Sequence, residues 1–298
     1  MFSRRQKLLN IYARWFQKPA LALITPPRLA RLTFNLNART IYKSPKGLTT
    51  RALNQNCTIC ALDNAATHGT ILYVHGGAFV IGSLVGYRHL IATLAKETGM
   101  RGVYVDYPLA PENPAPAALD AVTDAYVSLL ADPDTGPIAL VGDSAGGNLV
   151  LALLHRIIAR DLTRPFAVGA LSPVTDLALV NPSLETNQKV DLLVPMSWGL
   201  RGITQYLNGA NPADPELSPV HGTFTDAGPV LIHTDTTEVL NDDAHNMAKT
   251  LRDQGVDVAI RETTGLPHVN HLNLGRSPEA DAAVAHISAF LSQHLPAN

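Results

Sequence analysis

The sequence has little of what would mark a disulfide-stapled, nucleic-acid-binding or membrane-spanning protein. It contains two cysteines among 298 residues, which are too few for a disulfide scaffold. Charged residues make up only 16% and the formal net charge is −2, so nothing global points to a nucleic-acid partner. Apolar residues reach 46%, which excludes the disordered class. A chain of this length can bury roughly 75% of its unfolded surface and needs no staple to fold.

Long hydrophobic runs are also missing. The longest apolar run, Leu149–Leu154, is far below the roughly 20 residues that a membrane span needs. Arg14 and Lys18 interrupt any hydrophobic core of a secretory signal, and no Ala-x-Ala cleavage site follows them. The sequence therefore predicts a cytoplasmic protein with no integral membrane segment.

Acidic residues are absent from the first 62 positions, which hold 11 Lys and Arg, whereas residues 63–298 hold 12 basic and 25 acidic residues. A basic, amphipathic N-terminus of this kind could make weak contact with an anionic membrane surface. The alternative is a positive lid that rests on a negative body. We favour the lid, because the basic residues continue well past the first expected helix.

From about residue 57 the sequence alternates short β-rich runs with longer helical stretches, which predicts a mostly parallel sheet covered on both faces. The predicted strands are 69–75, 102–107, 137–142, 167–171, 229–234 and 256–262. The predicted helices are 87–98, 115–131, 145–160, 241–254 and 279–294, with Asn241 and Ser277 as expected N-caps. Residues 1–45 and 181–220 break the alternation. They predict two helices around Pro26-Pro27 and one near 197–208, as a lid or as edge packing.

The strongest chemical signal is Gly142-Asp143-Ser144-Ala145-Gly146, which follows a buried strand and opens an apolar helix. This context is typical of a nucleophile elbow, where a serine sits on a tight, strained turn with its hydroxyl exposed. Side chains at 142 and 146 would clash as strand and helix pack closely around that turn. The alternative is an ordinary strand-to-helix turn that contains a small residue.

A glycine loop, His75-Gly76-Gly77-Ala78-Phe79, ends the strand that precedes this elbow by some seventy residues. A serine that attacks an acyl carbon creates an oxyanion, which free backbone N–H groups can stabilise. We expect these donors to be Gly76 and Gly77, with Ala145 next to the nucleophile as the third. On its own the loop could merely end a strand, but beside the elbow it favours an oxyanion hole.

These motifs, with Asp106-Tyr-Pro-Leu-Ala-Pro-Glu112, Leu171-Ser-Pro-Val-Thr-Asp-Leu177 and Asp214-Pro-Glu-Leu-Ser-Pro219, resemble the hormone-sensitive-lipase-like esterases of the α/β-hydrolase superfamily. The match runs from about residue 40 to 295. The resemblance implies an α/β-hydrolase fold, a helical cap, carboxylic-ester substrates and no cofactor. It suggests an N-terminal cap segment over 1–45 and a catalytic domain over 46–298, with 181–210 contributing to the cap.

Two positions depart from the family pattern. The usual third glycine of the oxyanion loop is Ala78, a change that leaves the expected Gly76 and Gly77 donors in place. A usual arginine is replaced by Pro108, which removes an expected ion-pair partner of Glu112 and should alter the local electrostatics rather than abolish activity.

A nucleophilic serine needs a base, which in this fold follows the serine and an acid along the chain. Six histidines lie late enough, at 233, 245, 268, 271, 286 and 294. Gly265-Leu-Pro-His268-Val lies just beyond the last predicted strand and before the last helix, where open α/β sheets place ligand-binding groups, and it resembles the family's catalytic Pro-His-Val stretch. We expect His268 to be the base, with His271 as the reserve.

The acid should follow strand 229–234, where Asp235, Glu238, Asp242 and Asp243 compete. The family's Asp/Glu-x-Leu-x-Asp pattern matches Glu238-Val-Leu240-Asn-Asp242, which makes Glu238 the implied acid and Asp235 its rival. Asp242 and Asp243 fit better as favourable charges at a helix N-terminus.

The sequence thus predicts a serine carboxylesterase for small esters, with a small-molecule ester as its partner and a homodimer as an open possibility. The resemblance to the family implies a preference for short acyl chains. An amidase or a lactonase with the same triad is an alternative, and so is a non-catalytic receptor of this fold. Cys57-Thr-Ile-Cys60 could suggest a redox pair or half of a zinc site. We expect two inert strand cysteines, because positions three apart in a strand face opposite ways. Phe79, Trp198 and Tyr206 could line the substrate pocket or simply pack.

Overall fold

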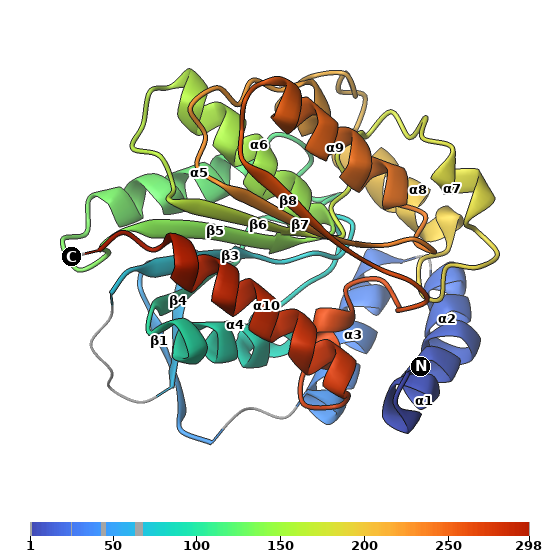
Figure 1. Ribbon diagram of the computed structural model, residues 1–298. Helices are drawn as coiled ribbons and strands as arrows, with labels where there is room; N and C mark the ends of the chain where they lie inside the picture. Colours follow the sequence, from blue (N-terminus) through green and yellow to red (C-terminus); the bar gives the residue numbers. More distant parts are fainter. Residues whose placement is uncertain (1, 25, 43–45, 63–67, 298) are drawn as a thin grey trace.

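The computed structural model describes residues 2–24, 26–42, 46–62 and 68–297, and an eight-stranded sheet forms its centre (Figure 1). The strand order is β1-β2-β4-β3-β5-β6-β7-β8. The strands are β1 Leu48–Ala52, β2 Cys57–Leu62, β3 Thr70–Val74, β4 Arg101–Val105, β5 Ile138–Asp143, β6 Ala167–Leu171, β7 Val230–Asp235 and β8 Val258–Thr263. All neighbours from β4 to β8 pair in parallel, while β1, β2 and β4 pair antiparallel. The predicted α/β fold with a mostly parallel sheet is confirmed.

All six predicted strands are present, and the central ones are completely buried, as continuous apolar runs require. The antiparallel extension through β1 was not predicted. Four of the five residues of β1, Leu48–Ala52, are exposed, and its sequence Leu-Thr-Thr-Arg-Ala carries no apolar run that would have revealed a strand.

Helices cover both faces of the sheet, as Figure 1 shows. The helices α4 (Leu84–Thr98) and α10 (Pro278–His294) lie on one face, and α5 (Ala117–Leu130), α6 (Ala145–Ala159) and α9 (Asn241–Asp253) lie on the other. Each face has its own apolar core. The five predicted helices are confirmed to within a few residues at their ends.

The two expected N-caps have different outcomes. Ser277 caps α10, since its hydroxyl accepts the Ala280 N–H at 3.2 Å. The prediction for Asn241 is wrong, because Asn241 is already the first residue of α9 and its side-chain amide donates to Glu262 Oε1 at 3.1 Å.

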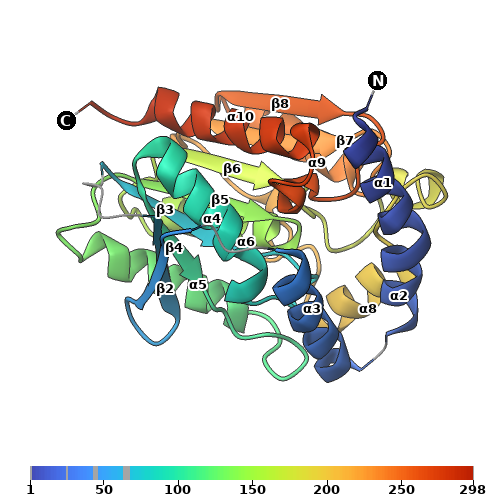
Figure 2. The ribbon, with the colours of Figure 1, turned by 90° about the horizontal axis from the view of Figure 1, so that it is seen from below.

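The N-terminal segment is helical on both sides of Pro26-Pro27, as predicted. It consists of α1 (Arg4–Tyr12), a π-helical stretch (Ala13–Gln17), α2 (Lys18–Leu23) and α3 (Pro27–Ile41). The predicted helix near 197–208 is α8 (Met196–Leu207), preceded by the short α7 (Ser183–Thr186). Figure 2 shows α1, α2, α3 and α8 together at one end of the molecule, and α2 contacts α8. The predicted cap boundary at residue 45 lies outside the described residues.

Glu112 has a cationic partner despite the proline at 108. Arg31 on α3 holds the Glu112 carboxylate with two hydrogen bonds, of 3.0 and 2.7 Å, and also donates to the Val80 and Ala110 carbonyls. The partner that the motif lacks is therefore supplied by the N-terminal segment. This bond lowers the pKa of Glu112 below its ordinary value.

The cysteines behave as expected. Cys57 and Cys60 are free, buried residues of β2 that belong to different apolar cores, one on each face of the sheet. Burial raises the pKa of the Cys60 thiol to about 12, which leaves it unreactive. Among the described residues, no helix is both long and apolar enough to cross a membrane.

Candidate active site

Ser144 sits on the sharp turn between β5 and α6. Its backbone has φ 52° and ψ −117°, a strained conformation for a side-chain-bearing residue. A Cβ at Gly142 would lie 2.3 Å from the Gly146 carbonyl oxygen, and a Cβ at Gly146 would lie 2.1 Å from that of Val74. Both flanking glycines are therefore required for the close packing of strand and helix, as predicted.

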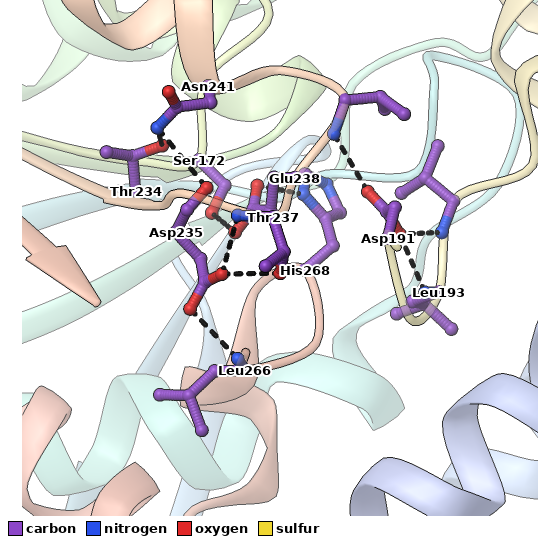
Figure 3. A network of polar contacts seen from close by, with 12 residues as sticks. Ser172, Asp191, Leu193, Thr234, Asp235, Thr237, Glu238, Asn241, Leu266 and His268 are labelled. Atoms are coloured by element: carbon purple, nitrogen blue, oxygen red, sulfur yellow. Dashed lines mark hydrogen bonds and ion pairs between the residues drawn. The ribbon is translucent and has the colours of Figure 1, made fainter. Parts of the chain in front are cut away.

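Two loops at the same edge of the sheet bring His268 and Glu238 together (Figure 3). His268 follows β8 and Glu238 follows β7, and the His268 Nδ1 lies 2.8 Å from Glu238 Oε2. The second carboxylate oxygen, Oε1, accepts the hydroxyl of Ser172 at 2.7 Å. Because both of its oxygens are hydrogen-bonded, the carboxylate of Glu238 is fixed in orientation. Since Nδ1 of His268 binds this carboxylate, Nε2 is the ring nitrogen that can bind another group.

Ser144 and His268 line one pocket of about 920 Å³, counting the part that opens to solvent. Glu238 lies behind this pocket and instead borders a smaller cavity together with Ser172 and His271. The arrangement places hydroxyl and imidazole toward the pocket, with the carboxylate on the far side of the imidazole.

The electrostatics of the pair follow from burial and mutual charge. Burial alone would lower the pKa of His268, but the charge of Glu238 and the hydrogen bond to it raise that pKa above the ordinary value. Burial raises the pKa of Glu238, and the charge and hydrogen bond of His268 oppose that rise. The site therefore favours an imidazolium that rests against a carboxylate, the ion pair that forms when the histidine takes a proton.

The expected set of oxyanion donors needs a correction at Gly76. The Gly76 N–H donates to Asp143 Oδ1 at 3.0 Å, so this donor is already occupied and cannot serve a ligand in the pocket. Gly77 and Ala78 are partly exposed and line the pocket. Within the described residues, the N–H groups of Gly77, Ala78 and Ala145 have no hydrogen-bond acceptor. The available donors are therefore these three.

Asp143 holds the oxyanion loop in place. Its buried carboxylate accepts the Tyr73 hydroxyl at 2.9 Å as well as the Gly76 N–H. A Cβ at Gly76 would lie 2.3 Å from Asp143 Oδ2, so only glycine fits there. Burial raises the pKa of Asp143 to about 6, against the opposing hydrogen bonds.

Asp235, the rival candidate for the acid, binds backbone N–H groups and not His268. Its carboxylate accepts the Gly265 N–H at 2.8 Å and the Leu266 N–H at 2.9 Å, in the loop that leads to His268. Figure 3 shows the bond to Leu266. Asp242 and Asp243 do lie in the first turn of α9, but they also bind across to other loops. Asp243 Oδ1, for example, accepts the Thr175 N–H at 2.7 Å. Of the four acids considered, only Glu238 contacts His268.

Two positioning residues escaped the sequence reasoning, Ser172 and Asp191. Asp191 accepts the Val239 N–H at 3.0 Å, next to Glu238, and the Leu193 and Val194 N–H groups at 2.7 and 2.8 Å. These hydrogen bonds connect the 181–210 insertion to the loop that carries Glu238. Ser172 lies in the Leu171–Leu177 motif, directly after β6. The motif indicated that Ser172 is at the edge of the sheet, but not that its hydroxyl binds Glu238.

The remaining late histidines are placed away from the pocket. His271 Nε2 lies 2.8 Å from His233 Nδ1, and His233 Nε2 lies 3.0 Å from His286 Nδ1. Burial lowers the pKa of all three histidines, that of His271 to about 3, which favours their neutral forms. His271, the reserve candidate for the base, does not line the pocket.

The walls of the pocket are almost wholly apolar. Phe79 and Trp198 line it, whereas Tyr206 is buried behind Phe79 and stacks on it with ring centroids 3.8 Å apart. Helix α8 crosses directly over the oxyanion loop, since a Cβ at Gly202 would lie 2.7 Å from Ala78 Cβ. Within the described residues, no group of three or more His, Cys, Asp or Glu side chains is arranged to hold a metal ion.

Comparisons with known proteins agree with this geometry. A family model described as alpha/beta hydrolase fold matches residues 71–272. An esterase of Acinetobacter venetianus is 37% identical over 222 residues, which are 74% of this chain and 73% of that protein. An ethyl acetate hydrolase of Pseudomonas putida is 31% identical, with 78% and 76% covered. A crystal structure of an esterase from the bacterial hormone-sensitive lipase family matches with a TM-score of 0.90 at 30% identity, over 99% of this chain and 100% of that one.

Proposed function

This chain is a carboxylic ester hydrolase of the hormone-sensitive-lipase-like group within the α/β-hydrolase family, and we propose that it cleaves small esters through Ser144, His268 and Glu238. The observation that supports these roles most is the bond from His268 Nδ1 to Glu238, which turns the other ring nitrogen toward a pocket that Ser144 also lines. That order of hydroxyl, imidazole and carboxylate is what nucleophilic acyl transfer by a serine requires.

In the first half-reaction, His268 Nε2 takes the proton of the Ser144 hydroxyl while Oγ bonds to the acyl carbon. The carbonyl oxygen becomes an oxyanion, and the N–H groups of Gly77, Ala78 and Ala145 stabilise it. The intermediate then expels the alcohol oxygen, which receives the proton from His268. The products of this step are an acyl-enzyme at Ser144 and a free alcohol.

In the second half-reaction, water replaces the alcohol. His268 takes a proton from the water while the water oxygen bonds to the acyl carbon. The N–H groups of Gly77, Ala78 and Ala145 stabilise the second oxyanion. Collapse of this intermediate returns the proton to Ser144 Oγ and releases the carboxylic acid. Glu238 keeps the imidazole in the right tautomer and stabilises its charged form in both steps.

Short acyl chains are the proposed preference. The support is the likeness to relatives named for such substrates, an acetyl-hydrolase of Streptomyces hygroscopicus at 34% identity and the ethyl acetate hydrolase of Pseudomonas putida. The helices that cover the pocket, with Leu21 of α2 and Trp198 of α8 in its wall, act in this proposal as the cap.

A series of p-nitrophenyl esters from acetate to palmitate, with p-nitroacetanilide as the matched amide, tests this proposal. We expect kcat/KM to be highest among the acetate-to-butyrate esters, and the anilide to be hydrolysed far more slowly. Ser144→Ala should lose turnover of every ester. Equal rates for anilide and ester would favour an amidase, and a correctly folded wild-type protein without turnover would favour a receptor. Near-normal turnover by Ser144→Ala, in a preparation free of other hydrolases, would contradict the mechanism.

A further inference from the structure

Many large apolar side chains of the N-terminal helices are exposed. Leu8, Ile11, Trp15, Phe16 and Leu23 on the continuous stretch from α1 to α2 are 53–79% exposed. On α3, Leu29, Leu32 and Leu36 are 46–55% exposed at helical spacing. These eight residues are called the outer face below. So many exposed large apolar residues in one short segment mark an interaction surface rather than scattered surface positions.

The opposite side of α1 packs against the body of the protein. Gln6 is fully buried and exchanges hydrogen bonds with Asn270, at 3.1 and 3.2 Å, and accepts the Ser277 hydroxyl at 2.6 Å. Asn10 donates to the Gly265 carbonyl at 2.8 Å. Helix α1 is thus docked on the loop that carries His268, and the outer face stays exposed with the helix in its proper place.

Positive charge surrounds the outer face and is not neutralised by the body. Arg4, Arg5, Lys7, Arg28 and Arg39 are exposed, and none forms an ion pair with a described residue. Arg31, with its bond to Glu112, is the exception within the described part of the segment. The expectation of a positive lid that rests on a negative body thus holds at one residue, while most of the cations point to solvent.

The outer face also adjoins the mouth of the substrate pocket. Leu21 on α2 and Leu200 on α8 both line that pocket, and Leu200 is itself 53% exposed. Figure 2 shows the four helices α1, α2, α3 and α8 at the same end of the molecule. Whatever binds the outer face therefore lies close to the entrance of the site.

We propose that the outer face docks on an anionic phospholipid surface. Exposed tryptophan, phenylalanine and leucine among exposed Lys and Arg are the composition of helices that lie in the membrane interface. Basic side chains near an anionic bilayer each add to the affinity. A symmetric contact with a second copy would set these cations against each other, since residues 1–62 contain no acid to pair with them. Charge complementarity thus favours lipid over self-association.

Flotation with vesicles measures this docking directly. The probe is vesicles of phosphatidylcholine mixed with phosphatidylglycerol, against vesicles of phosphatidylcholine alone, and the protein is Ser144→Ala so that no lipid is consumed. We expect binding to the mixed vesicles, which falls as salt is added. Arg4→Gln, Arg5→Gln and Lys7→Gln together should weaken the partition by on the order of 10²-fold. Trp15→Ser with Phe16→Ser should weaken it by at least about tenfold.

The matched control is Val127→Ser with Leu130→Ser on α5, two exposed apolar residues away from the outer face, which should not change flotation. Point variants are preferable to deletion of residues 1–40, because the deletion also removes Gln6 and Asn10 from the loop of His268. Flotation that is absent, or equal for the outer-face and control variants, would overturn the proposal. A dimer in light scattering that the Trp15 and Phe16 variant abolishes would also overturn it, and would assign the face to a second copy.

The consequence for substrates, which rests on the proposed function, is that esters dissolved in lipid reach the pocket from the membrane. In an enzyme with Ser144 intact, Trp15→Ser with Phe16→Ser should slow hydrolysis of hexadecyl acetate in mixed vesicles by at least about tenfold. Turnover of soluble p-nitrophenyl acetate should be unchanged, because neither residue lines the pocket. Loss of both activities would point to a damaged site, and loss of neither would contradict delivery from lipid.

Discussion

The carboxyl edge of the sheet and the N-terminal helices are built in opposite ways. At the edge, buried polar side chains are hydrogen-bonded to one another, as in the chain from Ser172 to Glu238 to His268. In the N-terminal helices, large apolar side chains such as Trp15 are exposed, and most cations have no partner. The edge fixes reacting groups in position, while the helices offer a surface to something outside the chain. A substitution at the edge should therefore change chemistry, and one on the helices should change access.

The largest effect is expected from Glu238→Gln at the edge. The amide cannot stabilise an imidazolium and favours the wrong tautomer, so kcat should fall by on the order of 10³–10⁴-fold while KM changes little. Steady-state kinetics with p-nitrophenyl acetate measures this, with circular dichroism to verify the fold. A loss of less than about tenfold would contradict the role of Glu238.

The pH profile sharpens the same prediction. His268 must be neutral to take a proton, so kcat/KM should fall as the pH drops through its pKa, which lies above the ordinary value because of Glu238. In Glu238→Gln that cause is gone, so the acid limb of the residual activity should move to lower pH. An acid limb that stays in place would show that another group controls it.

The oxyanion loop gives the next effect. In Gly76→Ala the new Cβ would meet Asp143 Oδ2, so the loop must shift and its donors with it. We expect a loss of about 10²–10³ in kcat, the usual result of a lost oxyanion donor. The matched control is Ala78→Gly, which adopts the φ of 50° at that position more readily and should retain wild-type activity. Equal effects of the two variants would argue against the donor set.

A smaller effect is expected for Ser172→Ala, which leaves the carboxylate of Glu238 with one hydrogen bond fewer. A hydrogen bond to a charged group contributes about 1.5–3 kcal/mol, so kcat should fall by about 10- to 100-fold if the Glu238 carboxylate shifts. KM should be unchanged, because Ser172 does not line the substrate pocket. A change confined to KM would contradict a positioning role.

The smallest effect is expected where the two regions meet, at Glu112→Gln. The pair with Arg31 is partly exposed, so its loss should cost about 0–1 kcal/mol of unfolding free energy and leave the kinetics of soluble esters nearly unchanged. Urea denaturation measures the stability. A loss comparable to that of a core variant would mean that the N-terminal helices support the sheet more than their exposure indicates.

Local patterns were enough to predict the six parallel strands, the helices that cover them and the turn at Ser144, because apolar runs and required glycines are properties of a few neighbouring residues. They missed the exposed strand β1, which has no apolar run. They also predicted that the loops of Glu238 and His268 follow parallel strands and so lie at the same edge of the sheet. They failed at Gly76, since whether an N–H is free depends on a distant carboxylate, Asp143. For the same reason, nothing local identified Ser172 as a partner of Glu238.

The N-terminal helices show the other limit. Their composition indicated a basic amphipathic segment, but periodicity does not say which side packs on the body. That choice is made by Gln6 and Asn10, polar residues whose partners Asn270, Ser277 and Gly265 lie more than 250 positions away. The buried side of α1 holds Leu9 as well as Gln6, and the exposed side holds cations as well as Leu8 and Ile11, so hydrophobicity alone does not decide which side packs on the body.

The most direct test of the account is the rate at which a fluorophosphonate phosphonylates the protein with release of fluoride, with the modified residue located by peptide mass spectrometry. We predict one label, on Ser144, and a labelling rate that falls by on the order of 10³-fold or more in His268→Ala because the serine loses its base. A label on another residue, or a rate at Ser144 that does not depend on His268, would contradict the account.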